Sequence, residues 1–219
     1  MRSMVNAALI DMLPMPQRLA AAYAPARSRQ ANLALLALDA RLAAILRGRH
    51  EPIAAQLRLA WWRETLATPP GEWPRGEPVL DALRDWKDPS CLSALPDGWE
   101  ALLGETLDRA AVAAHASGRA QAFECLAREL GVGQSAEVGN AARLWAMADL
   151  AAHLRDARER KLAVEMGLAL PRPARLPRAL RPLTVLAALG RAALERGGGP
   201  LLAGRGSAFL ALRAGVAGR

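Results

Sequence analysis

The scarcity of β-branched residues constrains this chain most strongly. Val, Ile and Thr together account for only 15 of the 219 residues, whereas Ala, Leu and Arg dominate. β-Strands favour β-branched and aromatic side chains, while Ala, Leu and Arg are good helix formers. Hydrophobic residues make up 52% of the chain and charged residues 23%, which is enough apolar surface for a core. The sequence therefore predicts an all-α protein that folds as a single-domain helical bundle.

Apolar residues recur at helical spacing along most of the chain. Leu35, Leu38 and Leu42 predict a helix over about 29–47, and Pro52 begins a second helix over about 52–67. The second helix is apolar around most of its circumference, which predicts a central position in the bundle. Further helices are expected over 77–87, over 97–130 with an interruption at Ser117–Gly118, over 135–161, near 182–196 and near 206–216.

Positive charge is concentrated in the last third of the chain. The formal net charge is +8; residues 1–154 hold 16 Lys and Arg against 17 Asp and Glu, and residues 155–219 hold 13 against 4. Such a segment is either a solvated basic surface or a binding surface for phospholipid head groups, diphosphates or an acidic protein. Nucleic acid is not an expected partner, because the segment is poor in aromatics for base stacking, with Phe209 as the one aromatic residue, and no nucleic-acid motif occurs.

The last residues predict a short basic amphipathic helix. Such a helix either lies on an anionic membrane surface or packs back on the bundle. The residues that give this stretch (SAFLALRAGVAGR and the arginine before it) its apolar and basic character are Arg205, Phe209, Leu210, Leu212, Arg213 and Arg219. The longest uncharged stretch is nine residues, too short for a transmembrane helix. We therefore expect a cytoplasmic protein, with peripheral contact at the inner face of the membrane as an option.

Cysteines and histidines give no metal-binding pattern. Cys91 and Cys125 lie in separate predicted segments, and we interpret them as small apolar fillers in a reduced cytoplasm. His50, His115 and His153 lie far apart in the sequence without ligand spacing, which favours structural or surface roles.

Several segments in order along residues 30–170 resemble squalene/phytoene synthases. They are LALLALDARLAAILRGRHEPIAAQLRLAWWRETL (33–66), GEPVLDAL (76–83), LAAHLRDARER (150–160) and LALP (168–171), of which LRLAWWRE is the most specific. The resemblance implies the isoprenoid (terpenoid) synthase fold, built around a deep apolar cavity. It divides the chain into an N-terminal helical lead-in (1–28), a synthase-like core (29–170) and basic Pro/Gly-interrupted helices (171–219) that pack on the same domain.

The resemblance also implies a magnesium-dependent prenyltransferase, but its acidic motifs are degenerate here. In that family two acidic clusters on facing helices hold Mg²⁺ and prenyl diphosphates. Alignment of the first cluster places Ala43, Ala44 and Arg47 where carboxylates belong. The second cluster is partial, because Asp156 and Glu159 match while an arginine replaces a further acid. We therefore expect no resident cofactor, with Mg²⁺ at Asp156 and Glu159 only if catalysis persists.

Candidate site residues follow from this comparison. Asp149, His153, Asp156 and Arg160 fall at i, i+4, i+7 and i+11, one stripe of the helix expected over 135–161. The stripe is either a remnant diphosphate site or a solvated, ion-paired face; Asp39 with Arg47 is either a similar remnant or a plug in a former metal site. The candidates for binding a ligand or diphosphate are Asp39, Arg47, Asp149, Arg155, Asp156, Glu159 and Arg160. Trp61, Trp62 and Trp145 are candidates for lining a cavity, with Trp61 and Trp62 more simply core anchors.

Three functions remain open from the sequence. The first is a non-catalytic synthase-like protein that binds a prenyl lipid, a prenyl diphosphate or a partner protein. The family offers a precedent in a mitochondrial respiratory complex I assembly factor, which is similarly stripped of acidic motifs. The second is an active prenyltransferase acting on farnesyl or geranylgeranyl diphosphate. The third is a structural bundle whose cavity is filled by side chains such as Trp145 or Met147.

Overall fold

The computed structural model describes residues 2–47, 52–133 and 135–218. Within these ranges all regular secondary structure is helical. The α-helices are α1 (Arg2–Met12), α2 (Met15–Ala22), α3 (Ala26–Arg47), α4 (Pro52–Ala67), α5 (Pro78–Leu83), α6 (Ala94–Glu100), α7 (Arg109–Glu129), α8 (Ala136–His153), α9 (Ala157–Leu168), α10 (Arg181–Glu195) and α11 (Gly204–Ala217). Short 3₁₀ turns add η1 (Pro70–Glu72), η2 (Pro89–Leu92), η3 (Ala101–Leu103) and η4 (Arg178–Leu180). The all-α prediction is confirmed for the described chain.

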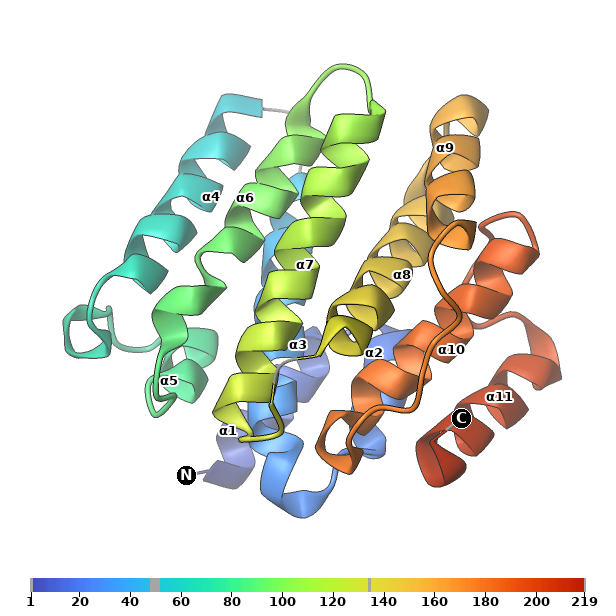
Figure 1. Cartoon of the computed structure of the whole chain (residues 1–219). Coiled ribbons are helices and arrows are strands. Elements are labelled where there is room, and N and C mark those ends of the chain that lie inside the picture. The colour runs from blue at the N-terminus through green and yellow to red at the C-terminus, as the bar shows by residue number, and fades with distance from the viewer. Residues whose placement is uncertain (1, 48–51, 134, 219) are drawn as a thin grey trace.

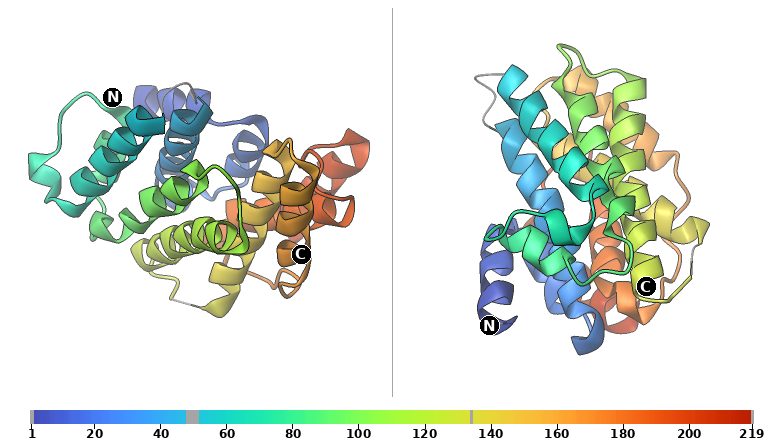
Figure 2. Two further views of the ribbon diagram at one scale, coloured as in Figure 1. Left: turned by 90° about the horizontal axis from the view of Figure 1, so that it is seen from above. Right: turned by 90° about the vertical axis from the view of Figure 1, so that its left-hand side faces the viewer.

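The bundle is organised around α3, α7 and α8. In Figure 1, α4, α6, α7 and α8 stand side by side, with α3 behind them. Helices α10 and α11 pack together beside α8, and α1 and α2 close one end of the bundle (Figures 1 and 2). One core cluster contains side chains from all of these regions, including Leu9, Leu38, Trp145 and Leu186. In the part of the chain that the structure describes, no helix is both long and apolar enough to cross a bilayer.

The helix breaks differ from the predicted ones in two places. Helix α7 continues through Ser117–Gly118, and the expected pair over 97–130 is instead separated by η3 and the loop that follows it. Gly118 is a contact point: a Cβ there would lie 2.8 Å from the carbonyl oxygen of Ala94 and 3.0 Å from the Cα of Gly98. The glycine therefore allows α6 and α7 to approach closely, and it does not end a helix.

The helix expected over 135–161 is also two helices. Helix α8 ends at His153, and Leu154 has an extended backbone (φ −73°, ψ 132°). Asp156 then caps α9, because its Oδ1 accepts hydrogen bonds from the backbone N–H groups of Arg158 (2.8 Å) and Glu159 (3.0 Å). A capping aspartate explains the break that the apolar periodicity did not reveal. The predicted polar stripe from Asp149 to Arg160 is therefore split between two helices.

Helix α4 lies at the edge of the bundle, which corrects the prediction of a central helix. Its buried side is formed by Ala55, Leu59, Trp62 and Leu66. On its outer side Ile53, Leu57 and Trp61 are 73%, 67% and 44% exposed. The interpretation of Trp61 as a core anchor is wrong, whereas that of Trp62 is confirmed.

Cys91 and Cys125 form a disulfide between η2 and α7, with their Cα atoms 6.0 Å apart. This spacing lies within the usual range for a disulfide. The pairing corrects the interpretation of both cysteines as apolar fillers. Because disulfides are rare in a reducing cytoplasm, the redox state of this pair is a direct indicator of the compartment in which the protein works.

Candidate functional site

The most unusual group in the interior is Arg119, at the middle of α7. Its side chain is 1% exposed. The residues around it are small (AAHASGRAQA), so the guanidinium can extend from α7 into the space between α3 and α8. A buried charge is costly unless it is paired and hydrogen-bonded, so its partners decide what this region can do.

Arg119 joins two carboxylates from different helices. Its Nε and Nη2 donate to Oδ1 and Oδ2 of Asp39 on α3, each at 2.9 Å, in the two-pronged geometry that suits a guanidinium. Nη2 also donates to Oδ2 of Asp149 on α8, at 2.8 Å. Trp99 of α6 donates from its indole Nε1 to Oδ1 of Asp39, at 3.0 Å. One cation thus connects α3, α7 and α8; we call Asp39, Arg119 and Asp149 the ionic cluster.

Aromatic rings enclose the ionic cluster. The guanidinium carbon of Arg119 lies 4.3 Å from the ring centre of Trp145 and 4.9 Å from that of Trp99, within cation–π distance. Trp99 also packs edge-on against His115 at 4.6 Å, and Trp145 against Phe123 at 5.8 Å. Trp145 and Phe123 are both buried. The space in which a cavity was expected is therefore occupied by tryptophan and arginine side chains.

Burial is the largest influence on the pKa values of Asp39 and His115. Desolvation raises the pKa of the Asp39 carboxyl above its ordinary value, although the charge and hydrogen bonds of Arg119 oppose the rise; the nearby Asp149 carboxylate adds to it. Desolvation also lowers the pKa of His115 well below its ordinary value, and the positive charge of Arg119 lowers it further. His115 is therefore a neutral imidazole at physiological pH.

The ionic cluster does not fit a magnesium site. Mg²⁺ requires carboxylate oxygens that are free to coordinate it in near-octahedral geometry. Both oxygens of Asp39 and one of Asp149 instead accept hydrogen bonds from a guanidinium that lies between the two carboxylates. A divalent ion between these groups would meet that guanidinium and be repelled by it. Elsewhere in the described ranges, no group of three or more His, Cys, Asp and Glu side chains is arranged to hold a metal ion.

The structure brings only two of the predicted ligand-site residues together. Asp39 and Asp149 meet at Arg119, whereas Arg47 lies exposed at the last residue of α3 and takes no part in the cluster. The pairing of Asp39 with Arg47 is thus replaced by pairing with Arg119. Of the predicted cavity residues, Trp145 fills the interior, and Trp61 and Trp62 line an outer groove.

The remaining candidates serve the junction between α8 and α9. Asp156 caps α9, and the carboxylate of Glu159 accepts a hydrogen bond from the backbone N–H of Leu107, at 3.0 Å. Arg160 donates to the carbonyl oxygen of Leu154 at 2.7 Å, and Arg155 is exposed. Asp156 and Arg160 thus hold nearby backbone, and Glu159 connects α9 to the loop before α7. The contacts do not converge on a common ligand position.

The sequence analysis missed Arg119 and Trp99, and it gave His115 no specific role. A signal for Arg119 is present, because it is the one charged residue between Arg109 and Glu124 on a helix of small residues. Val112, Phe123 and Leu126, at helical spacing from Arg119, are apolar, which places the arginine on the buried side of the helix. Its partners could not be identified, because they lie 80 and 30 residues away in the sequence.

A groove of about 580 Å³ lies on the outside of the bundle between α3 and α4. Five of its eight lining residues are apolar, and two of the charged ones, Arg41 and Glu77, form an ion pair at 3.0 Å. No ion pair of Arg58 occurs within the described residues. The lining residues are Arg41, Ala44, Ile45, Leu57, Arg58, Trp61, Trp62 and Glu77.

Comparison with known proteins gives no relative. No protein-family model, curated protein or solved structure matches this chain. The resemblance to squalene/phytoene synthases therefore rests on the sequence segments quoted above.

Proposed function

We propose that this chain is a non-catalytic helical protein that binds a helix of a partner protein in the groove between α3 and α4. The ionic cluster is the observation that supports a non-catalytic protein. Asp39 and Asp149, the two carboxylates that are buried among the described residues, both form ion pairs with Arg119. Arginine thus holds α3, α7 and α8 together without a metal ion. The positions at which the family resemblance expects the first carboxylates are occupied by Ala43, Ala44 and Arg47, which cannot bind magnesium.

The filled interior also disfavours prenyl binding inside the bundle. A prenyl chain needs a continuous apolar cavity that covers most of its surface. Trp99, Trp145 and Arg119 fill the region between α3, α7 and α8, and all three are buried. The proposal therefore moves binding from the interior to the outside of the bundle.

The outer side of α4 supports a protein partner. Ile53, Leu57 and Trp61 are spaced by four residues, so they form one apolar row along the exposed side of the helix. A prenyl chain lying in this open groove would leave much of its own surface in water. An amphipathic helix would instead cover the whole row and interdigitate its own apolar side chains with it.

The charged residues that line the groove indicate what kind of partner helix would fit it. Arg41 is already paired with Glu77, whereas Arg58 has no ion pair within the described residues. We expect a partner helix whose apolar residues recur every three or four positions and which carries an acidic residue beside them. The acidic residue would pair with Arg58 at the edge of the contact.

A photo-cross-linking residue at position 57, compared with one at exposed position 161, tests the docking surface. We expect a discrete protein adduct from position 57 that is absent from position 161. The cross-linked helix is then synthesised, and its affinity is measured by fluorescence anisotropy. Leu57→Glu should weaken binding by about tenfold or more, since it removes a leucine that the partner helix would cover. Gln56→Glu, the same charge on a neighbouring exposed position, should change it little.

Two results would count against the proposal. Equal adducts from positions 57 and 161, or a peptide affinity that Leu57→Glu leaves intact, would remove the groove as the binding surface. Incubation with labelled farnesyl and geranylgeranyl diphosphate plus Mg²⁺ tests whether the protein is non-catalytic. Turnover above that of heat-denatured protein would establish the prenyltransferase alternative.

A further inference from the structure

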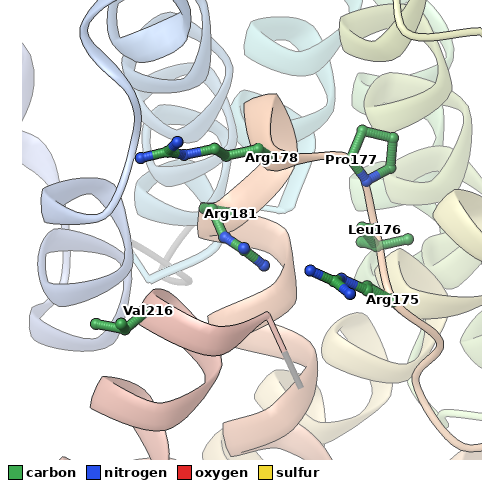
Figure 3. A pocket seen from close by; sticks show the side chains of 6 residues that line it. All are labelled: Arg175, Leu176, Pro177, Arg178, Arg181 and Val216. Atoms are coloured by element: carbon green, nitrogen blue, oxygen red, sulfur yellow. The ribbon is translucent and has the colours of Figure 1, made fainter.

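A second concave surface, unrelated to the α3–α4 groove, lies where η4, α10 and α11 meet. Its volume is about 650 Å³. Every charged side chain that lines it is an arginine, and the lining residues are Arg175, Leu176, Pro177, Arg178, Arg181 and Val216. Figure 3 shows the guanidinium groups of Arg175 and Arg181 pointing toward one another across this space. We call it the arginine groove.

Arg181 is a buried cation that forms no ion pair with any of the described residues. Its side chain is 8% exposed, and its Nη1 is buried with no hydrogen-bond partner among the described residues. Desolvation, and then repulsion from Arg175 and Arg178, lowers the pKa of Arg181. An unpaired buried guanidinium is costly, and an anion in the groove would satisfy it.

No Asp or Glu side chain lies near Arg181 in the sequence. No Asp or Glu occurs between Glu165 and Glu195, or after Glu195. None of the described ion pairs involves Arg175, Arg178 or Arg181. Helix α10 begins at Arg181 without a side-chain cap, so the positive end of its dipole lies at the same place. The groove is thus electropositive from both side chains and backbone.

An exposed apolar row on α11 adjoins the arginine groove. Phe209, Leu212 and Val216 are 70%, 50% and 69% exposed, and their spacing of three and four residues places them on one side of the helix. Val216 also lines the groove, so the row and the groove share an edge. The side chain of Arg205 and residue Arg219, two of the basic residues predicted to accompany this row, lie outside the described residues.

We propose that the arginine groove binds the phosphate of an anionic phospholipid while the apolar row of α11 enters the membrane interface. Phosphate is the ligand that converging guanidinium groups hold best, because their N–H donors match its oxygens. A soluble phosphate would satisfy the groove but would leave Phe209, Leu212 and Val216 in water. A phospholipid satisfies both features at once, since its head group and acyl region lie next to each other.

Vesicle flotation with the full chain tests this proposal. We expect the protein to float with vesicles of phosphatidylcholine and phosphatidylglycerol, and to remain behind with phosphatidylcholine alone. Each basic residue at a membrane surface changes the affinity by about fivefold, so Arg175→Gln with Arg178→Gln should weaken binding by about 25-fold. These two arginines are exposed, so their replacement should leave the fold intact.

Matched variants distinguish a general effect of net charge from specific binding at the arginine groove. Arg109→Gln with Arg158→Gln removes the same net charge from two other exposed arginines and should retain most of the binding. Phe209→Ser with Leu212→Ser keeps the arginines and should also lose flotation, because the apolar contribution is removed.

Three outcomes would overturn the assignment. They are the absence of flotation with anionic vesicles, equal loss in the control pair and the Arg175/Arg178 pair, and full binding by the Phe209/Leu212 variant. Calorimetry with inorganic phosphate and with pyrophosphate distinguishes the sources of the ligand. Tight, Arg175- and Arg178-dependent binding of either ion without flotation would identify a soluble phosphate as the ligand.

Discussion

Replacement of Arg119 by methionine tests the role of the ionic cluster most directly. Methionine has a similar length and no charge, so Arg119→Met leaves Asp39 and Asp149 buried without their shared cation. Removal of one partner from a buried ion pair costs about 3–5 kcal/mol, because the remaining charge is uncompensated. For a domain of this size, that corresponds to a melting temperature lower by roughly 6–20 °C.

The stability lost in Arg119→Met should depend on pH, and the direction of that dependence can be predicted. Burial raises the folded-state pKa of Asp39 above its ordinary value, and the loss of Arg119 removes a group that lowers this pKa. A carboxyl with a raised folded-state pKa destabilises the fold as pH rises through that pKa, because the unfolded state then releases its proton more readily. The deficit of Arg119→Met relative to wild type should therefore be largest near neutral pH and should narrow as the pH falls toward 4.

Urea unfolding of both proteins across this pH range measures the deficit. Asp39→Asn and Asp149→Asn, introduced together with Arg119→Met, remove the unpaired charges and should restore more than half of the lost stability. A deficit below about 1 kcal/mol that is the same at all pH values would show that Arg119 is not the counter-ion of these carboxylates.

Three further predictions follow from other parts of the structure. Denatured protein should show no free thiol until it is reduced, and reduction of Cys91–Cys125, which are 34 residues apart, should lower stability by about 3–4 kcal/mol; two titratable thiols without reductant would contradict the disulfide. Gly118→Ala should cost about 1–3 kcal/mol in urea melts, because its Cβ would collide with α6, whereas Gly206→Ala on α11 has open space and should be neutral or stabilising; equal effects would refute the close approach. Because the folded-state pKa of His115 is depressed, wild type should lose about 1.4 kcal/mol between pH 7.5 and 5.5 that His115→Leu does not lose, and parallel pH profiles would refute a neutral buried His115.

Local sequence signals predicted the helices well where they had clear boundaries. Pro52 begins α4, and the expected helices near 182–196 and 206–216 correspond to α10 and α11. The errors arose where one residue type has two roles. Gly118 was interpreted as a break although it permits close packing, and Asp156 was placed within a helix although it caps one. Periodicity cannot separate these roles, because they depend on tertiary neighbours and on backbone hydrogen bonds.

The candidate site was harder to predict than the fold. Asp39 and Asp149 were identified from the family resemblance, but their true partner is Arg119, on a helix outside the segments that carry the resemblance. Likewise, the apolar circumference of α4 predicted burial, whereas Ile53, Leu57 and Trp61 face outward. Hydrophobicity alone does not distinguish a core helix from one with an exposed apolar side, because both have the same composition.

The way Arg119 joins three helices has a consequence for how the protein responds to its surroundings. A magnesium bridge exists only while the ion is supplied, and it is removed by a chelator. A guanidinium is part of the chain and stays protonated throughout the physiological pH range. The junction of α3, α7 and α8 therefore forms with the polypeptide itself, and its strength should be the same in EDTA as in millimolar magnesium.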